Sequence, residues 1–188
     1  MLEAHAGAEH LFSAYPGDDP SHAHLRDWLT LPASKQVGYK AALGHYSYGA
    51  FDAIITNPQK YFVTFLRHPI DRVISLYKHT LIAHPSYVNS DAKLMDFLDD
   101  PDEGIRIQID NHQTRMVSGT PDEIPITRDS FVRALDNMRG KFGFVGLTEH
   151  FAQDVANLAA HIQAALPHER RNVSNDRRTR EHFSEEVT

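Results

Sequence analysis

An arginine and a serine that lie close together in the sequence, Arg67 and Ser75, have side chains suited to binding phosphate groups. The guanidinium of an arginine is planar and offers paired donors that match two phosphate oxygens, and a serine hydroxyl adds another donor. Pro69 and Tyr77 complete the pattern R-x-P-x-x-R-x-x-S-x-Y. These residue types indicate an anion-binding site. The alternative is an ordinary strand, turn and helix with an incidental arginine.

The elements that must position these two residues are predicted from the hydrophobic pattern. Residues 61–66 (YFVTFL) are almost continuously apolar, which is typical of a strand buried on both faces of a parallel sheet. Pro69 fits the first position of a helix. Arg67 would then stand at the carboxyl end of the strand and Ser75 in the helix, where α/β proteins bind anions. The apolar stripe expected on this helix is Ile70, Val73, Ile74, Tyr77 and Leu81.

Residues 67–77 (RHPIDRVISLY) resemble the 3′-phosphate-binding segment of sulfotransferases. The similarity is to the Golgi-type carbohydrate family, which includes heparan sulfate 2-O-sulfotransferase and its bacterial relatives. The resemblance implies that Arg67 and Ser75 bind the 3′-phosphate of the co-substrate 3′-phosphoadenosine 5′-phosphosulfate (PAPS). His68 departs from the acidic residue common at its position, but neither binding residue is altered.

A Gly-His pair, Gly44-His45, follows a second short strand expected over residues 39–43. Imidazole has an ordinary pKa of about 6.5 and therefore accepts a proton at neutral pH. In the resembled family, a histidine of such a pair acts as general base on the acceptor hydroxyl, which implies that role for His45. The alternative is a turn histidine that caps the strand.

Three further arginines are candidate contacts by the same resemblance. Residues 111–116 (NHQTRM) resemble a segment that lines the acceptor side of the cleft, which makes Arg115 a candidate ligand of a substrate carboxylate or sulfate. A structural ion pair is the alternative for Arg115. Arg177 and Arg178 match a basic loop that folds over the nucleotide in the family, or they belong to a solvated basic tail.

The resemblance extends over nearly the whole chain and implies an α/β fold of the P-loop nucleotide kinase and sulfotransferase type, with three layers around a parallel sheet. The family opens with a strand and a Pro-Lys donor loop, whereas the first lysine here is Lys35 and follows no such strand. We therefore expect residues 1–188 to form a single, partial domain that begins after the donor loop. Because that loop supplies a lysine and N–H groups to the leaving phosphate, we expect the chain to be inactive alone.

Three functions are compatible with these motifs. The first is transfer of a sulfuryl group from PAPS to a hydroxyl, most simply that of a saccharide. The second is a non-catalytic fragment, or a nucleotide- or saccharide-binding module of the same fold. The third is a nucleotide kinase-like enzyme, which is disfavoured because no G-x-x-x-x-G-K-[ST] occurs in the sequence.

The composition of the 188 residues excludes other classes of function. The net charge of −6 argues against general nucleic-acid binding, and the absence of cysteine excludes disulfides and thiolate catalysis. His22 and His24 have no second ligand pair at a recognisable spacing, so no metal site is expected. No apolar run reaches the roughly 20 residues that span a bilayer. A bacterial, cytoplasmic protein is the simplest expectation, and its oligomeric state stays open.

The remaining elements are predicted from periodicity and from end signals. The acidic residues around 99–102 are expected to form a solvated face. The expected elements are a strand at 11–15, helices at 25–31, 92–98, 105–117 and 130–138, a strand at 142–147, and a helix capped by Thr148. The helix at 130–138 should turn Phe131, Ala134, Leu135 and Met138 inward, and the last should bury Phe151, Val155, Leu158, Ile162 and Leu166.

Overall fold

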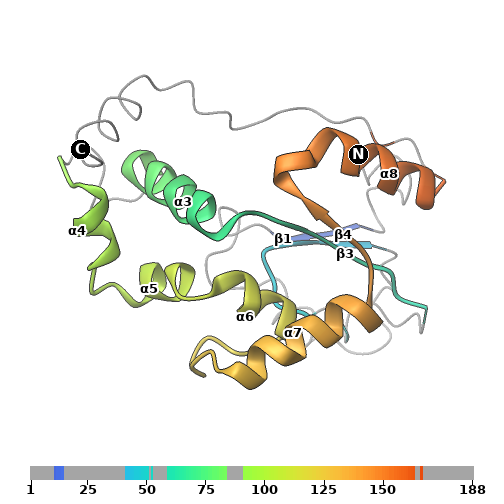
Figure 1. Cartoon of the computed structure of the whole chain (residues 1–188), viewed down its shortest axis with the longest axis horizontal. Coiled ribbons are helices and arrows are strands. Elements are labelled where there is room, and N and C mark those ends of the chain that lie inside the picture. Colours follow the sequence, from blue (N-terminus) through green and yellow to red (C-terminus); the bar gives the residue numbers. More distant parts are fainter. Residues whose placement is uncertain are drawn as a thin grey trace. The chain divides into compact units, whose positions relative to one another are not determined.

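The computed structural model describes residues 11–14, 41–50, 52, 59–83, 91–163 and 166 (Figure 1). The described residues fall into two compact units, one within residues 1–66 and 110–166 and the other within residues 67–109. Helices and parallel strands are both present, which is compatible with the predicted α/β class. The helix expected at 25–31 lies outside the described residues.

Four strands of the described part of the first unit form two parallel pairs. β1 (Leu11–Ala14) pairs with β2 (Ala41–Gly44), and β3 (Phe62–Leu66) pairs with β4 (Phe142–Leu147). All four strands are confirmed, with boundaries within two residues of those predicted. Parallel strands cannot be joined by a tight hairpin, so a long connection that contains helices separates β3 from β4 in the sequence.

Strand β3 is less buried than predicted. Val63 keeps 39% of its surface exposed, although aromatic rings cover other parts of the strand. Phe65 packs against Phe151 with ring centroids 5.2 Å apart, and Tyr48 packs against Phe62 at 4.9 Å. The faces of a parallel sheet are buried by the helices that pack on them, and the exposure of Val63 shows that one face of β3 is only partly covered. The prediction of a strand buried on both faces is therefore wrong.

The single helix predicted at 105–117 is wrong, because the chain forms two helices there. α5 (Glu103–Ile109) ends before Asp110, and α6 (His112–Ser118) begins after Asn111. Asn111 has a φ of 49°, in the left-handed region, which breaks the helical path. Asparagine tolerates this conformation better than most residues do. The break also divides the two units, since α5 belongs to the second and α6 to the first.

Helix α7 (Arg128–Gly140) starts at a capping box in which Thr127 and Ser130 bond to each other's backbone N–H groups. Ala134 is buried, as predicted, and so is Ser130, whereas Phe131 is 51% exposed and its predicted inward position is wrong. Residues 148–150 form a short 3₁₀ turn, η3 (Thr148–His150). Thr148 is therefore not the cap of α8, contrary to the prediction.

Helix α8 (Phe151–His161) follows that turn directly and buries Val155 and Leu158, as predicted. The carboxylate of Asp154 in its first turn accepts a hydrogen bond of 2.7 Å from the backbone N–H of Leu147, at the end of β4. This bond satisfies a main-chain donor and places a negative charge near the positive end of the helix dipole. The side chain of Asp154 thus joins β4 to α8.

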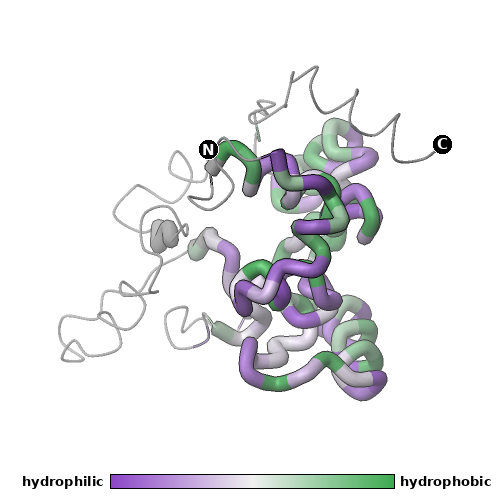
Figure 2. The backbone as a smooth tube through the Cα atoms, turned by 90° about the vertical axis from the view of Figure 1, so that its left-hand side faces the viewer, coloured by the Kyte–Doolittle hydropathy of each residue, from purple (hydrophilic) through white to green (hydrophobic). Residues whose placement is uncertain are grey.

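The second unit is built on α3 (Pro69–Ala83) and α4 (Leu94–Leu98), together with α5. Phe97 is fully buried and packs with Tyr77 and Ile105. The Tyr77 hydroxyl also donates to the carbonyl oxygen of Ala92 over 2.7 Å. Figure 2 shows hydrophilic and hydrophobic residues interspersed along the coiled parts of the backbone, which is typical of helices with one buried face.

Helix α3 starts at Pro69 as predicted, but its buried stripe is shorter than expected. Ile70 is 64% exposed, whereas Val73, Tyr77 and Leu81 contribute to the core of the second unit. The stripe begins one turn inside the helix because the core residues contributed by α4 and α5 pack against Val73 and the turns that follow it.

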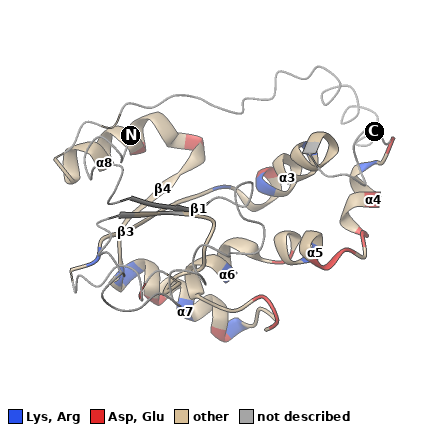
Figure 3. Cartoon of the chain, turned by 180° about the vertical axis from the view of Figure 1, so that it is seen from behind, with Lys and Arg blue, Asp and Glu red and all other residues tan. Residues whose placement is uncertain are grey.

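Acidic residues gather along α4 and the segment that leads to α5 (Figure 3). Asp99 and Asp102 remain exposed, as predicted, whereas Asp100 is half-buried. Several of these residues also bond to main-chain N–H groups. Asp96 accepts from Lys93 over 2.8 Å, and Asp102 accepts from Ile105 over 3.0 Å. Each carboxylate lies in the first turn or at the start of a short helix, where it satisfies donors that have no partner within the helix.

Candidate functional site

Arg67 and Ser75 stand at the junction between β3 and α3. Arg67 follows the last residue of β3 and is exposed, and Ser75 lies half-buried in the second turn of α3. The carbonyl oxygen of His68 accepts the first helical hydrogen bond, from the N–H of Arg72, over 2.9 Å. The first turn of α3 therefore lies between the two candidate residues, with the N–H groups and the positive dipole end that attract anions.

A histidine and an aspartate frame this first turn. Nδ1 of His68 lies 4.0 Å from Oδ2 of Asp71, an ion pair when the imidazole is protonated, and both side chains are more than half exposed. Asp71 stabilises the start of the helix by its charge, but it opposes an incoming anion. A protonated His68 offsets part of that negative charge. Arg72, the motif's other arginine, is half-buried, and burial lowers the pKa of its guanidinium.

His45 lies in the first unit, exposed, immediately after β2. The segment that follows it contains two consecutive turns, closed by hydrogen bonds of 3.0 Å from Ala50 to Ser47 and from Asp52 to Gly49. Within these turns the N–H of Tyr48 donates to the carbonyl oxygen of Met116 on α6 over 2.7 Å. The segment that carries His45 is thus attached to the helix that carries Arg115.

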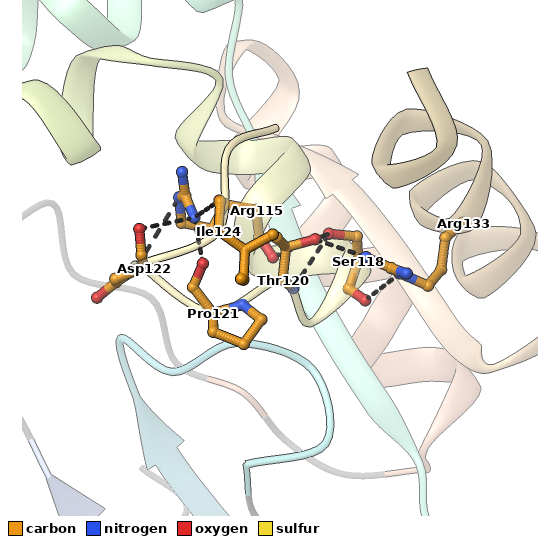
Figure 4. A network of polar contacts seen from close by, with 7 residues as sticks. All are labelled: Arg115, Ser118, Thr120, Pro121, Asp122, Ile124 and Arg133. Carbon is orange, nitrogen blue, oxygen red and sulfur yellow. Dashed lines mark hydrogen bonds and ion pairs between the residues drawn. The ribbon is translucent and has the colours of Figure 1, made fainter. Parts of the chain in front are cut away.

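Arg115 is only 3% exposed, and its guanidinium is bound by the loop that follows α6 (Figure 4). Nη1 donates to the carbonyl oxygens of Pro121, of Asp122 over 3.3 Å and of Ile124 over 2.8 Å. Nε lies 3.9 Å from the carboxylate of Asp122. Because Nη1 is directed at the protein's own main chain, the geometry supports a structural role for Arg115.

The C-terminal end of α6 is held by two side chains of α7. Nε of Arg133 donates to the carbonyl oxygen of Ser118 over 3.1 Å, and its Nη2 donates to the hydroxyl of Thr120 over 2.7 Å. Asn137 donates to the carbonyl oxygen of Val117 over 2.9 Å. Sequence reasoning did not find these contacts. Its one available signal was the i, i+4 spacing of Arg133 and Asn137, which places them on the same helix face.

Other candidates named from the sequence are not part of this description. Arg177, Arg178, His22 and His24 lie outside the described residues. Within the described ranges, no group of three or more histidine, cysteine, aspartate or glutamate side chains is arranged to hold a metal ion. The helices seen in the same ranges are all too short or too polar to cross a membrane.

Comparison of the chain with protein-family models, with curated proteins and with solved structures finds no match. The resemblance to sulfotransferases therefore rests on the motif residues themselves and on the elements that carry them.

Proposed function

We propose that this chain is part of a PAPS-dependent sulfotransferase that transfers a sulfuryl group to a hydroxyl, most simply that of a saccharide. The fold proposed with it has three layers around a parallel sheet. The observation that carries the proposal is the junction of β3 and α3, which has Arg67 directly after a parallel strand and Ser75 in the second turn of the next helix. This arrangement supports binding of a phosphate by the arginine, the hydroxyl and the start of the helix.

Each candidate residue has a defined chemical role in this proposal. Arg67 and Ser75 hold the 3′-phosphate of the nucleotide and so fix the donor. His45 accepts the proton of the acceptor hydroxyl. As it does so, the oxygen of that hydroxyl forms a bond to sulfur, and the bond from sulfur to the 5′-phosphate oxygen breaks. The leaving group is adenosine 3′,5′-bisphosphate. Fixing the donor makes this displacement effectively unimolecular, which lowers its entropic cost.

Calorimetric titration with adenosine 3′,5′-bisphosphate tests the nucleotide site directly. We expect the wild-type chain to bind and Arg67→Ala to bind about 10-fold or more weakly, because a charged hydrogen-bonding group is lost. Arg106→Ala is the matched control, since Arg106 is another exposed arginine of the second unit. Equal affinity of the wild type and Arg67→Ala, or no binding by the wild type, would reject the site.

The state of Arg115 favours a second function, a nucleotide-binding module without catalysis. Arg115 is the residue expected to bind the acceptor, but its Nη1 donates to carbonyl oxygens of its own loop. An assay with radiolabelled PAPS and saccharide acceptors separates the two functions. Label transfer that His45→Ala lowers by about 10²–10⁴-fold supports the transferase with His45 as its base. Because the chain alone is expected to be inactive, the assay uses a version extended upstream to carry a Pro-Lys donor loop. Binding of the bisphosphate with no label transfer in that extended version supports the module.

A further inference from the structure

We infer that Tyr48, Gly119 and Arg133 are positioning residues for His45, an inference that rests on the proposed role of His45 as general base. His45 is exposed and follows β2 directly, so the position of its imidazole depends on the backbone of the segment that carries it. A general base must hold its nitrogen within hydrogen-bond reach of the proton it removes. The position of this segment therefore affects the reaction directly.

Tyr48 fixes the segment through both its main chain and its ring. The backbone N–H bonds to Met116 of α6 over 2.7 Å. The ring packs on Phe62 of β3 and Phe142 of β4, with centroid distances of 4.9 Å and 5.6 Å. Three residues from His45, the chain is thus attached to a helix and to a pair of strands in the same unit.

Gly119 allows this close approach. It has a φ of 71°, and a β-carbon built on it would lie 2.6 Å from the carbonyl oxygen of Tyr48. Atoms in folded proteins do not approach a β-carbon so closely, and a backbone oxygen cannot rotate away as a side chain can. Any residue larger than glycine must therefore displace either the end of α6 or the segment that carries His45.

Arg133 stabilises the end of α6, which the segment that carries His45 contacts. Its guanidinium binds the carbonyl oxygen of Ser118 and the hydroxyl of Thr120, the two neighbours of Gly119. Ser118 and Thr120 are buried, and their hydroxyl oxygens are 2.7 Å apart. The turns that follow His45 end at Asp52, and Nζ of Lys60 lies 2.6 Å from the carboxylate of Asp52. Arg133 holds the end of α6, and Lys60 holds the segment that carries His45. Neither side can therefore move easily to make room for a side chain at position 119.

The test compares Gly119→Ala with Gly140→Ala, since a β-carbon on Gly140 meets nothing within 4 Å. The ring signals of ¹³C-labelled histidines are recorded, and His45→Gln identifies the signal of His45. We expect Gly119→Ala to shift or broaden this signal and Gly140→Ala to leave it unchanged. If label transfer is measurable, Gly119→Ala should also lower kcat, by up to about 10²-fold for a displacement near 1 Å, with little change in nucleotide affinity.

Arg133→Met provides a second variant, which loosens the end of α6 without adding atoms beside Tyr48. It should broaden the His45 signal, and Arg133→Lys should restore it in part because the charge remains. Unchanged His45 signals in Gly119→Ala and Arg133→Met would overturn the inference; if Gly119→Ala does not fold, Arg133→Met alone decides. The His45 signals can be recorded without enzymatic activity. The proposed function is tested separately, by whether the wild-type chain binds adenosine 3′,5′-bisphosphate.

Discussion

The guanidinium of Arg72 donates a hydrogen bond from Nη1 to the carbonyl oxygen of Gln108, 2.5 Å away. Gln108 lies in the last turn of α5, where carbonyl groups have no helical partner and the dipole is negative. Burial lowers the pKa of the Arg72 guanidinium, but an arginine stays charged at neutral pH. The second arginine of the motif thus caps α5 and joins it to α3, whereas the first, Arg67, is exposed.

Replacing Arg72 by methionine should destabilise the chain by about 1 kcal/mol, because a partly exposed hydrogen bond and a favourable charge at a helix end are lost. Urea unfolding followed by circular dichroism measures this change. Arg106→Met is the control, because it removes another arginine charge from the last turn of α5 without removing the hydrogen bond to Gln108. Equal midpoints for the two variants would mean that the contact between Arg72 and Gln108 adds nothing to stability.

Ser75→Ala should weaken binding of adenosine 3′,5′-bisphosphate by about 1.5–3 kcal/mol, or about 10- to 150-fold, if its hydroxyl donates to the 3′-phosphate. Ser75→Thr keeps a hydroxyl and should retain much of the affinity. Adenosine 5′-phosphate lacks the 3′-phosphate, so its affinity should be the same for wild type and Ser75→Ala. A mutation that weakens both ligands equally would place Ser75 away from the 3′-phosphate.

Arg115→Met should lower the free energy of unfolding by about 2–3 kcal/mol, since the carbonyl groups that bind the guanidinium lose a charged donor. Arg115→Lys should recover only part of this loss, because an ammonium group cannot reproduce the planar set of donors. Limited proteolysis should cut within residues 120–127 faster in Arg115→Met than in Arg139→Met, which removes an exposed arginine of α7. Unchanged stability with weakened saccharide binding would instead make Arg115 a substrate ligand.

The parts of the fold that could be predicted are those set by local chemistry. Pro69 begins α3 because its fixed φ and missing N–H suit the first helical position. Gly119 ends α6 because glycine adopts the left-handed conformation at little cost. The break at Asn111 could not be seen, since the apolar spacing continues across it and the break divides two units whose packing partners differ.

The candidate site likewise has parts that depend on neighbouring residues in the sequence and parts that depend on contacts between distant residues. Arg67 directly follows β3 in the sequence and Ser75 lies in α3, so the pattern of consecutive residues is enough to assign each to its element. The contact between Tyr48 and Gly119 joins residues far apart in the sequence, and no local pattern indicates it. The direction of a side chain such as Arg115 likewise depends on the loop folded around it, which the helix alone does not determine.

Two glycines of β4 provide the last prediction, because they differ in what would surround an added methyl group. A β-carbon on Gly146 would lie 2.5 Å from the ring of Phe65 and 3.0 Å from that of Phe144. A β-carbon on Gly143 would lie closer still to the ring of Tyr61, a residue that is 43% exposed, so this ring can move outward into solvent. That movement gives up the hydrogen bond of 2.9 Å from the Tyr61 hydroxyl to the carbonyl oxygen of Gly143 and the stacking on His161. Phe65 has less freedom, because its ring also packs on Phe151.

Gly146→Ala should therefore destabilise the chain by about 1–3 kcal/mol, the usual cost of overpacking, and Gly143→Ala should cost less. Denaturant midpoints of the two variants measure the difference. Phe65→Leu should cost less in the Gly146→Ala background than in the wild type, because the smaller side chain makes room for the added methyl group. If the two glycine variants are equally stable, or if Phe65→Leu gives no relief, the packing of Phe65 across β4 does not limit residue size at position 146.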